Sequence, residues 1–207
     1  MILWGRSSSV NVQKVLWALD ELDLPFEHRV VGGKYGGLDD AAFAALTPVR
    51  RVPVLQDGGE TLWESHTILR HLARRARRLG APEGAVDMWM EFGSTTVQPP
   101  FIAVFWQRVR TLPQDRRPEV EASNLAALGQ ALGILEMALD DGRDHIAGPA
   151  FSMADIALGS LTYRLRDLYP DIMAPTPRVA AWADRIARRP AFAARIATSY
   201  DELKVVP

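Results

Sequence analysis

All β-rich segments of this chain lie within its first 63 residues, and this distribution limits the folds that it can adopt. Residues 1–4 predict a strand, residues 10–22 a helix with one apolar face, and residues 26–31 a second strand. That succession predicts two parallel strands joined by a right-handed crossover. Residues 51–63 then predict a hairpin, because the Asp-Gly-Gly-Glu sequence at 57–60 favours a turn. We therefore expect a mixed four-stranded sheet with helices on its faces.

The remainder of the chain has a helical pattern to its end. A weaker helix at 41–46 and another from Ser65 complete the first part. Later helices are expected at 85–110, bent at Pro99 and Pro100, and at 119–140, 153–168, 179–189 and after Pro190. The sequence thus predicts an α/β domain over residues 1–78, a linker at 79–85 and an all-helical domain over residues 86–207.

Composition excludes several classes of function. The 207 residues, 48% of them apolar, can bury a core, and no apolar run is long enough to span a membrane. We expect a cytoplasmic protein, because the N-terminus lacks the features of a signal peptide. Without cysteine the chain has no thiol nucleophile of its own, and its four histidines lack metal-ligand spacing, so no metal is expected. A net charge of -1 gives no general attraction to nucleic acid or anionic lipid.

Pro53 lies inside the otherwise β-rich run RVPVL. Proline cannot donate a backbone hydrogen bond, so it belongs at a sheet edge or at the first residue of a strand. A cis bond between Val52 and Pro53 would turn the chain into the strand and leave the Val52 backbone free to pair with an extended peptide ligand. An ordinary trans bond is the alternative.

Glu64 and Ser65 lie at the entry of a helix whose apolar face carries Ile68, Leu69 and Leu72. Ser65 is a candidate N-cap, and capping alone is one interpretation. The functional alternative is that the free N–H groups and the hydroxyl at this helix N-terminus hold a ligand carboxylate. Glu64 could then hold a ligand ammonium group.

Taken together, the serine-rich start of the first helix, the VP at the third strand and the ES at the third helix resemble the glutathione S-transferase family. Ser152-x-x-Asp155 resembles the family's buried capping box, with Phe151 or a neighbour as the hydrophobic staple. The resemblance covers the whole chain, and it implies a thioredoxin-like first domain followed by the family's all-helical domain. Arg50 departs from the pattern, because many members have glycine there in NPxGxVP and this chain has TPVRRVP.

The resemblance also implies that glutathione is the co-substrate. Val52 would pair with its cysteinyl backbone, and the Glu-Ser pair would bind its γ-glutamyl group. Either Lys34 or Arg51 would supply the cation for its glycyl carboxylate. The implied glutathione-binding residues are Val52, Pro53, Glu64, Ser65, Lys34 and Arg51.

The serine-rich turn would hold the glutathione sulfur, since N–H groups at a helix N-terminus and a neutral hydroxyl donor favour thiolate over thiol. Many members use tyrosine there, but the only tyrosine before the linker is Tyr35, so the chain resembles the serine-type, bacterial-like cytosolic classes. Ser9 is in the register of the catalytic hydroxyl. Asn11 resembles the amide of members with a hydroxyl-x-Asn arrangement, which shares or takes over that role. Simple capping of the helix is the alternative interpretation.

A second, apolar pocket for the electrophile is expected in the helical domain. Its candidates are Phe101, Phe105, Trp106, Arg108 and Tyr163, although aromatic residues at helical spacing also form cores. The chain is therefore predicted to be a homodimeric glutathione transferase that conjugates a small hydrophobic electrophile in detoxification, with neither nucleic acid nor a membrane as partner. Glutathione-dependent disulfide or peroxide reduction, and a non-catalytic glutathione-fold binding module, are the alternatives.

Overall fold

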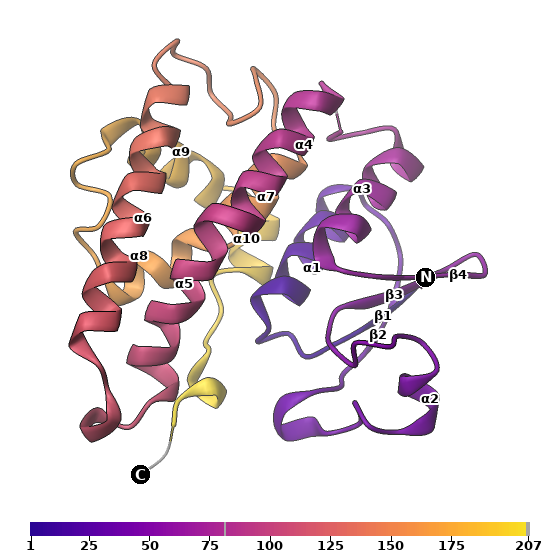
Figure 1. Cartoon of the computed structure of the whole chain (residues 1–207). Helices are drawn as coiled ribbons and strands as arrows, with labels where there is room; N and C mark the ends of the chain where they lie inside the picture. The colour runs from indigo at the N-terminus through magenta and orange to yellow at the C-terminus, as the bar shows by residue number, and fades with distance from the viewer. Residues whose placement is uncertain (81, 206–207) are drawn as a thin grey trace.

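The structure, a computed structural model, describes residues 1–80 and 82–205. It consists of a small sheet with three helices, beside a larger group of helices (Figure 1). Residue 81 of the predicted linker and residues 206 and 207 of the predicted second domain lie outside the described residues. No helix within the described ranges combines the length and apolar character that crossing a bilayer requires.

The four strands form one mixed sheet in the order β2-β1-β3-β4. β1 pairs parallel with β2 and antiparallel with β3, and β3 pairs antiparallel with β4, which confirms the predicted crossover and hairpin. Gly58 and Gly59 form the hairpin turn with positive φ values of 57° and 92°. Pro53 lies one residue before β3, where no ladder hydrogen bond needs its nitrogen. The strands are β1 (Ile2–Trp4), β2 (Glu27–Arg29), β3 (Val54–Asp57) and β4 (Glu60–Trp63).

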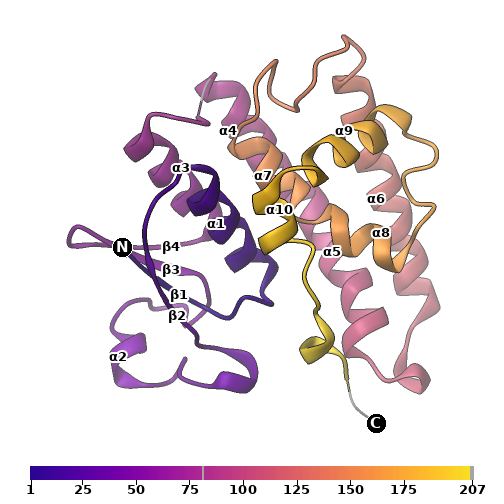
Figure 2. The ribbon, with the colours of Figure 1, turned by 180° about the vertical axis from the view of Figure 1, so that it is seen from behind.

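Two helices of the N-terminal part, α1 (Val10–Glu21) and α3 (Ser65–Ala76), lie between the sheet and the C-terminal helices (Figures 1 and 2). The short α2 (Ala41–Ala44) packs on the opposite face of the sheet. There the rings of Phe43 and Trp4 meet edge to face, with their centroids 6.0 Å apart. α1 was expected to bury one face only, but every residue from 12 to 19 is buried. The reason is that the C-terminal helices cover the side of α1 that the sheet does not.

The C-terminal helices differ from the predicted ones at two breaks. The expected helix at 85–110 gives way to a π-helical turn at Gly93–Val97, ahead of Pro99 and Pro100, which have no N–H for the carbonyls of the preceding turn. A second π-helical turn follows at Trp106–Arg110. The expected helix at 153–168 is divided into two. The helices are α4 (Glu83–Phe92), α5 (Gln98–Phe105), α6 (Pro118–Ala138), α7 (Met153–Gly159), α8 (Thr162–Leu168), α9 (Pro177–Ala187) and α10 (Pro190–Arg195).

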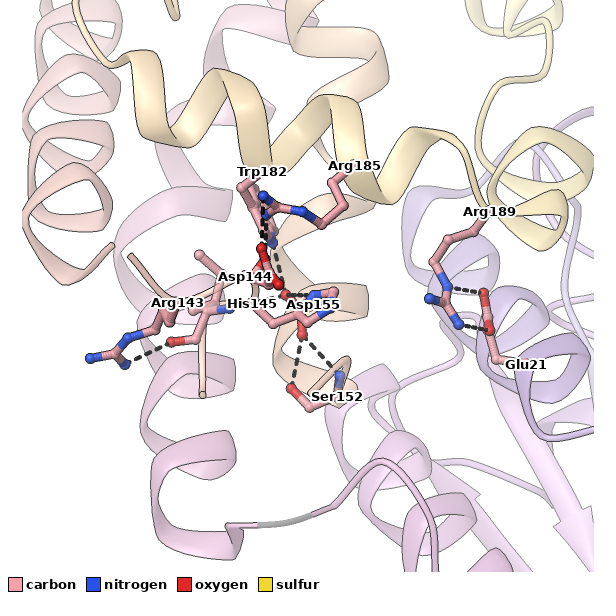
Figure 3. A network of polar contacts seen from close by, with 10 residues as sticks. Glu21, Arg143, Asp144, His145, Ser152, Asp155, Trp182, Arg185 and Arg189 are labelled. Carbon is pink, nitrogen blue, oxygen red and sulfur yellow. Dashed lines mark hydrogen bonds and ion pairs between the residues drawn. The ribbon is translucent and has the colours of Figure 1, made fainter. Parts of the chain in front are cut away.

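The two parts share one hydrophobic core. Trp17 of α1 is fully buried, and its ring lies 5.7 Å from that of Phe151 and 5.2 Å from that of Phe192. At the edge of this contact Arg189 donates two hydrogen bonds of 2.7 and 2.6 Å to Glu21 (Figure 3). The helical part therefore fixes the position of α1, and with it the serine-rich turn that precedes α1.

A buried carboxylate organises the start of α7. Ser152 and Asp155 form the capping box, in which Asp155 Oδ2 accepts hydrogen bonds from the Ser152 backbone and hydroxyl at 2.9 and 3.0 Å (Figure 3). Asp155 Oδ1 accepts from the Ile146 backbone at 3.1 Å and from Trp182 Nε1 at 2.8 Å. Asp155 is 0% exposed, so its charge is stabilised by four donors rather than by water.

Candidate active site

The sheet brings three of the predicted motifs to one of its ends. Val54, the first residue of β3, pairs with Trp4 of β1 and with Trp63 of β4. The serine-rich turn follows Trp4, Pro53 precedes Val54, and Glu64 follows Trp63. The register therefore places the N-terminus of α1, the Val52-Pro53 pair and the N-terminus of α3 along the same edge.

Two backbone features allow these segments to approach one another closely. The Val52-Pro53 peptide bond is cis, one of the two alternatives that remained open from the sequence. Gly5 has a φ of 144°, and a Cβ there would lie 2.5 Å from Val12 and 3.0 Å from Val52. Only glycine fits at this point, so Gly5 lets β1 pass between α1 and the segment before the cis proline.

Ser9 is the N-cap residue of α1 by its position and its extended backbone, with φ of -76° and ψ of 122°. Its side chain makes no capping hydrogen bond, so the hydroxyl is not used by the helix. Asn11 lies in the first turn, and its buried Oδ1 has no hydrogen-bond partner among the described residues. Both side chains thus have polar atoms that can interact with a ligand.

A cleft of about 500 Å³ separates this turn from the helical domain. Ser9 and Asn11 lie on one side of the cleft together with the segment before Pro53. Phe101, Phe105 and the half-exposed Trp106 lie on the other side, at the end of α5. Leu203, near the end of the chain, also lines the cleft, and no motif or pattern predicted this. The predicted residues that the cleft brings together are Ser9, Asn11, Arg51, Val52, Phe101, Phe105 and Trp106.

Arg108, which was assigned to the electrophile pocket, is not among the residues that line this cleft. It forms a 2.6 Å ion pair with Glu121 and stacks 5.4 Å from the Tyr169 ring. The π-helical turn at 106–110 is the cause, because it has more residues per turn than an α-helix and moves position 108 off the face of Phe101 and Phe105. Tyr163, also assigned to this pocket, is half-buried against the core and is not among the lining residues.

Lys34 also lies outside the cleft lining, on its rim. It forms a 2.9 Å ion pair with Glu202, and Tyr35 donates a 3.1 Å hydrogen bond to the same carboxylate. The Glu202 carboxylate raises the pKa of Lys34 above its usual value. Lys34 therefore already has an anionic partner, whereas Arg51 lines the cleft directly.

The start of α3 differs from the expectation at one residue. Glu64, not Ser65, is the N-cap, with a φ of 68° and no side-chain capping bond. Ser65 is the first helical residue and is 6% exposed, so it does not cap the helix. Arg50, which stands where many family members have glycine, also has a positive φ of 47° and an ion pair with Asp39 at 3.1 Å. The loop keeps a conformation that suits glycine although the residue is arginine.

Sequence reasoning missed a buried lysine beneath Glu64. Lys14 of α1 is 1% exposed, and its Nζ lies 3.2 Å from His66 Nε2 and 2.5 Å from Gln98 Oε1. Burial lowers the pKa of Lys14 to about 7, against the opposing charge of Glu64. Burial and the charge of Lys14 lower the pKa of His66 to about 3. The available signal was the pair Gln13 and Lys14, which lies between apolar residues in the middle of the predicted helix.

Three arginines of the cleft were also missed, namely Arg6, Arg110 and Arg164. Arg164 of α8 is 3% exposed and donates from Nη2 to the Ser8 carbonyl at 2.8 Å and to Gln13 Oε1 at 3.1 Å. The helical domain thereby holds the backbone of the serine-rich turn. Arg6 could have been suspected from its position directly before the serines.

Two family sequence models match the chain. One is described as glutathione S-transferase, N-terminal domain, and matches residues 3–81. The other is described as glutathione S-transferase, C-terminal domain, and matches residues 117–185. Together they span more than half of the chain.

Curated proteins and solved structures agree with this match. The chain is 31% identical over 197 residues to glutathione S-transferase GstB of Escherichia coli strain K12, covering 91% of this chain and 94% of GstB. It is 30% identical over 178 residues to glutathione S-transferase theta-1 of Rattus norvegicus, covering 79% of this chain and 72% of that protein. The theta class glutathione S-transferase of Xanthomonas axonopodis pv. citri, solved with glutathione bound, superposes with a TM-score of 0.86 at 33% identity, covering 96% of this chain and 98% of that one.

Proposed function

Because the chain belongs to the glutathione S-transferase family, we propose that Ser9 and Asn11 hold the sulfur of glutathione as a thiolate and direct it at an electrophile in the cleft. The chain is a glutathione transferase with a thioredoxin-like N-terminal domain. The assignment of the two residues rests on one observation: at the N-terminus of α1, both side chains line the cleft, and the Ser9 hydroxyl makes no capping hydrogen bond. The thiolate would accept hydrogen bonds from this hydroxyl and from the Nδ2 amide group of Asn11, since the Asn11 oxygen can only accept. The partial positive charge of a 12-residue helix favours an anion at the same place.

The remainder of glutathione would lie along the end of the sheet. We assign its cysteinyl backbone to Val52, which precedes the cis bond and lines the cleft. Its γ-glutamyl group would bind at Glu64 and Ser65, where the positive φ of Glu64 turns the chain into α3. Arg51 is the first choice for the glycyl carboxylate, because Lys34 must leave Glu202 before it can take that role.

Ionising the thiol supplies only a small part of the rate. Lowering a thiol pKa from about 8.5 to about 6.5 raises the thiolate fraction at pH 7 roughly 25-fold. Nucleophilicity falls with basicity, and a Brønsted slope of about 0.45 removes roughly eightfold of that gain. About threefold remains, so holding the electrophile against the sulfur must supply most of the acceleration. The wall of Phe101, Phe105 and Trp106 would perform that task.

We further propose a cytoplasmic homodimer that acts in detoxification, with a small electrophile as second substrate. These assignments are supported by family membership alone. The exposed Trp63 at the end of β4 and Met88 on α4 are apolar side chains that a second copy could cover.

Replacing Ser9 with alanine tests the assignment. We expect kcat/KM for conjugation of 1-chloro-2,4-dinitrobenzene to fall at least about tenfold, because a hydrogen bond to the thiolate is lost. The urea midpoint should not change, since Ser9 makes no capping bond. Ser7→Ala is the matched control, because Ser7 is two residues away and does not line the cleft.

The same assay separates the alternatives. An unchanged rate in Ser9→Ala together with a tenfold loss in Asn11→Ala would move the role to Asn11. Failure of the wild-type protein to bind glutathione at millimolar concentration, measured by titration calorimetry, would contradict the proposed site itself.

A further inference from the structure

The cleft carries an excess of positive charge. Four arginines line it, Arg6, Arg51, Arg110 and Arg164, and its described lining includes no aspartate or glutamate. None of the four forms an ion pair with an acidic side chain within the described ranges, whereas the nearby Lys34 and Arg108 both do. A cluster of unneutralised guanidinium groups in a partly enclosed site attracts anions.

Arg108 and Arg110 belong to the same π-helical turn but differ in whether an acidic side chain neutralises them. Arg108 is neutralised by Glu121 outside the cleft. Arg110, two residues on, is half-buried, lines the cleft, and lies with its guanidinium 5.4 Å from the Trp106 ring. Trp106 itself is 51% exposed, so part of its apolar surface is accessible to a bound molecule. Arg110 and Trp106 thus offer a cation beside an apolar surface.

Two of the guanidinium groups also have unused donors. Arg164 is almost completely buried, and its Nε has no hydrogen-bond partner among the described residues. The buried Nε of Arg6 is in the same condition. A buried N–H without a partner is unfavourable, so an acceptor brought by a ligand would stabilise both groups.

The arginines repel one another across the cleft. Burial, together with the charge of Arg6, lowers the pKa of Arg110. Burial lowers the pKa of Arg164 to about 10, and the charges of Arg110 and Arg6 act in the same direction. A negative charge bound in the cleft would therefore offset the repulsion between these arginines.

Glutathione does not account for all four arginines under the proposed function. Its glycyl carboxylate takes Arg51, its sulfur lies at Ser9, and its γ-glutamyl group lies towards Glu64. Arg110 belongs to the helical domain, on the side of the aromatic wall, and shares a second surface hollow with Arg6 beside Leu203. Lys34 and Glu202 also line this hollow, where they form an ion pair with each other. A carboxylate on the second substrate would reach this pair.

Resting on the proposed function, we infer that the second substrate is a carboxylate-bearing electrophile whose apolar or aromatic body lies on Trp106 and whose carboxylate pairs with Arg110. For an activated aryl chloride, the thiolate forms the C–S bond, chloride leaves with the electron pair of the C–Cl bond, and the thiol proton goes to water. The carboxylate takes no part in this exchange. It holds the ring in place, which raises kcat/KM through binding and orientation.

The test compares 4-chloro-3,5-dinitrobenzoate with its methyl ester, two electrophiles that share a ring and a leaving group and differ in charge. The kcat/KM of each is divided by its uncatalysed rate with glutathione. We expect the wild-type protein to prefer the carboxylate at least about tenfold. Arg110→Gln should reduce the preference below about threefold, and Arg110→Lys should retain part of it because the charge remains. Arg108→Gln, the matched control outside the cleft, should leave it unchanged.

Three outcomes would overturn the inference while the proposed function stands. One is equal use of acid and ester by the wild-type protein, and another is an unchanged preference in Arg110→Gln. The third is binding of two glutathione molecules per chain by calorimetry, with the second lost in Arg110→Gln, since the arginines would then serve a second tripeptide. Absence of any glutathione binding would instead contradict the proposed function.

Discussion

Asp155 and the cleft are two polar regions that differ in whether their buried polar atoms have hydrogen-bond partners. Asp155 is fully buried, and both of its oxygens accept two hydrogen bonds within the helical domain. At the cleft, buried polar atoms are left without partners. Six such atoms occur among the described residues, and four belong to residues that line the cleft, namely Arg6, Ser8, Asn11 and Arg164. The other two are Nδ1 of His66 and Nδ1 of His145, the latter 3.5 Å from Asp155.

The difference separates a structural polar group from a functional one. A buried polar network that is fully satisfied stabilises one fold and leaves nothing for a ligand. Orphaned donors and acceptors lower stability, so they persist where a ligand satisfies them. Charge alone would not have made this distinction, because both regions contain ionised side chains.

Removing the Asp155 carboxylate should give the largest effect on stability. Asp155→Ala leaves four donors without an acceptor, and we expect a loss of about 3–5 kcal/mol in the free energy of unfolding. Asp155→Asn retains one oxygen and should lose less. Urea denaturation followed by circular dichroism measures both. Asp144→Ala, which removes only a surface pair with Arg185, should lose less than about 1 kcal/mol. Equal losses in Asp155→Ala and Asp144→Ala would mean that the four hydrogen bonds of Asp155 add no more stability than one surface ion pair.

Lys14 is buried outside both regions and should make stability depend on pH. Its pKa of about 7 in the folded state lies below the 10.5 of the unfolded chain. Between these values the unfolded chain binds a proton that the folded chain does not, so wild-type stability rises with pH. We expect the stability difference between wild type and Lys14→Met to shift by about 2–3 kcal/mol in favour of wild type from pH 6 to pH 9.

The control for this shift is Lys34→Met, since Lys34 is exposed and should add no comparable rise above pH 7. His66 should affect stability at acidic pH. Its pKa of about 3 lies below the usual 6.5, so stability should fall as the pH drops through that range, and His66→Gln should lessen the fall. A difference between wild type and Lys14→Met that does not change with pH would mean that Lys14 stays charged when buried.

The smallest expected effect concerns the rim of the cleft. Glu202→Gln should release Lys34 and tighten glutathione binding by about two- to threefold, because an exposed ion pair is worth well under 1 kcal/mol. Asp201→Asn, which affects the neighbouring ion pair with Lys204 and a hydrogen bond from Ser199, is the control. Weaker or unchanged binding in Glu202→Gln, measured by calorimetry, would leave Arg51 alone at the glycyl end.

Local signals were sufficient to predict the N-terminal framework. Gly58 and Gly59 predicted the hairpin turn, and the proline at the start of β3 directed attention to a cis bond. The serine-rich turn was expected at the N-terminus of α1, where it lies. Each of these features depends on neighbours in the chain, so sequence periodicity and turn chemistry suffice to find it.

The charged part of the cleft could not be predicted in the same way. A regular α-helix through Phe101 and Phe105 would carry Arg108 near the same face, and only the π-helical turn at 106–110 brings Arg110 there instead. Arg164 lies more than 150 residues from Ser8 in sequence, and nothing in its own helix indicates that contact. These residues acquire their role from tertiary structure alone.

The hydrogen bond from Arg164 to the Ser8 carbonyl has a consequence for how such chains can be recombined. The loop that holds the reactive turn and the guanidinium that fixes it are encoded in opposite halves of the gene. In a chimaera made by exchanging helical domains between relatives, the serine-rich turn would come from one protein and the arginine that fixes it from another. The two halves are therefore constrained to diverge together rather than as interchangeable modules.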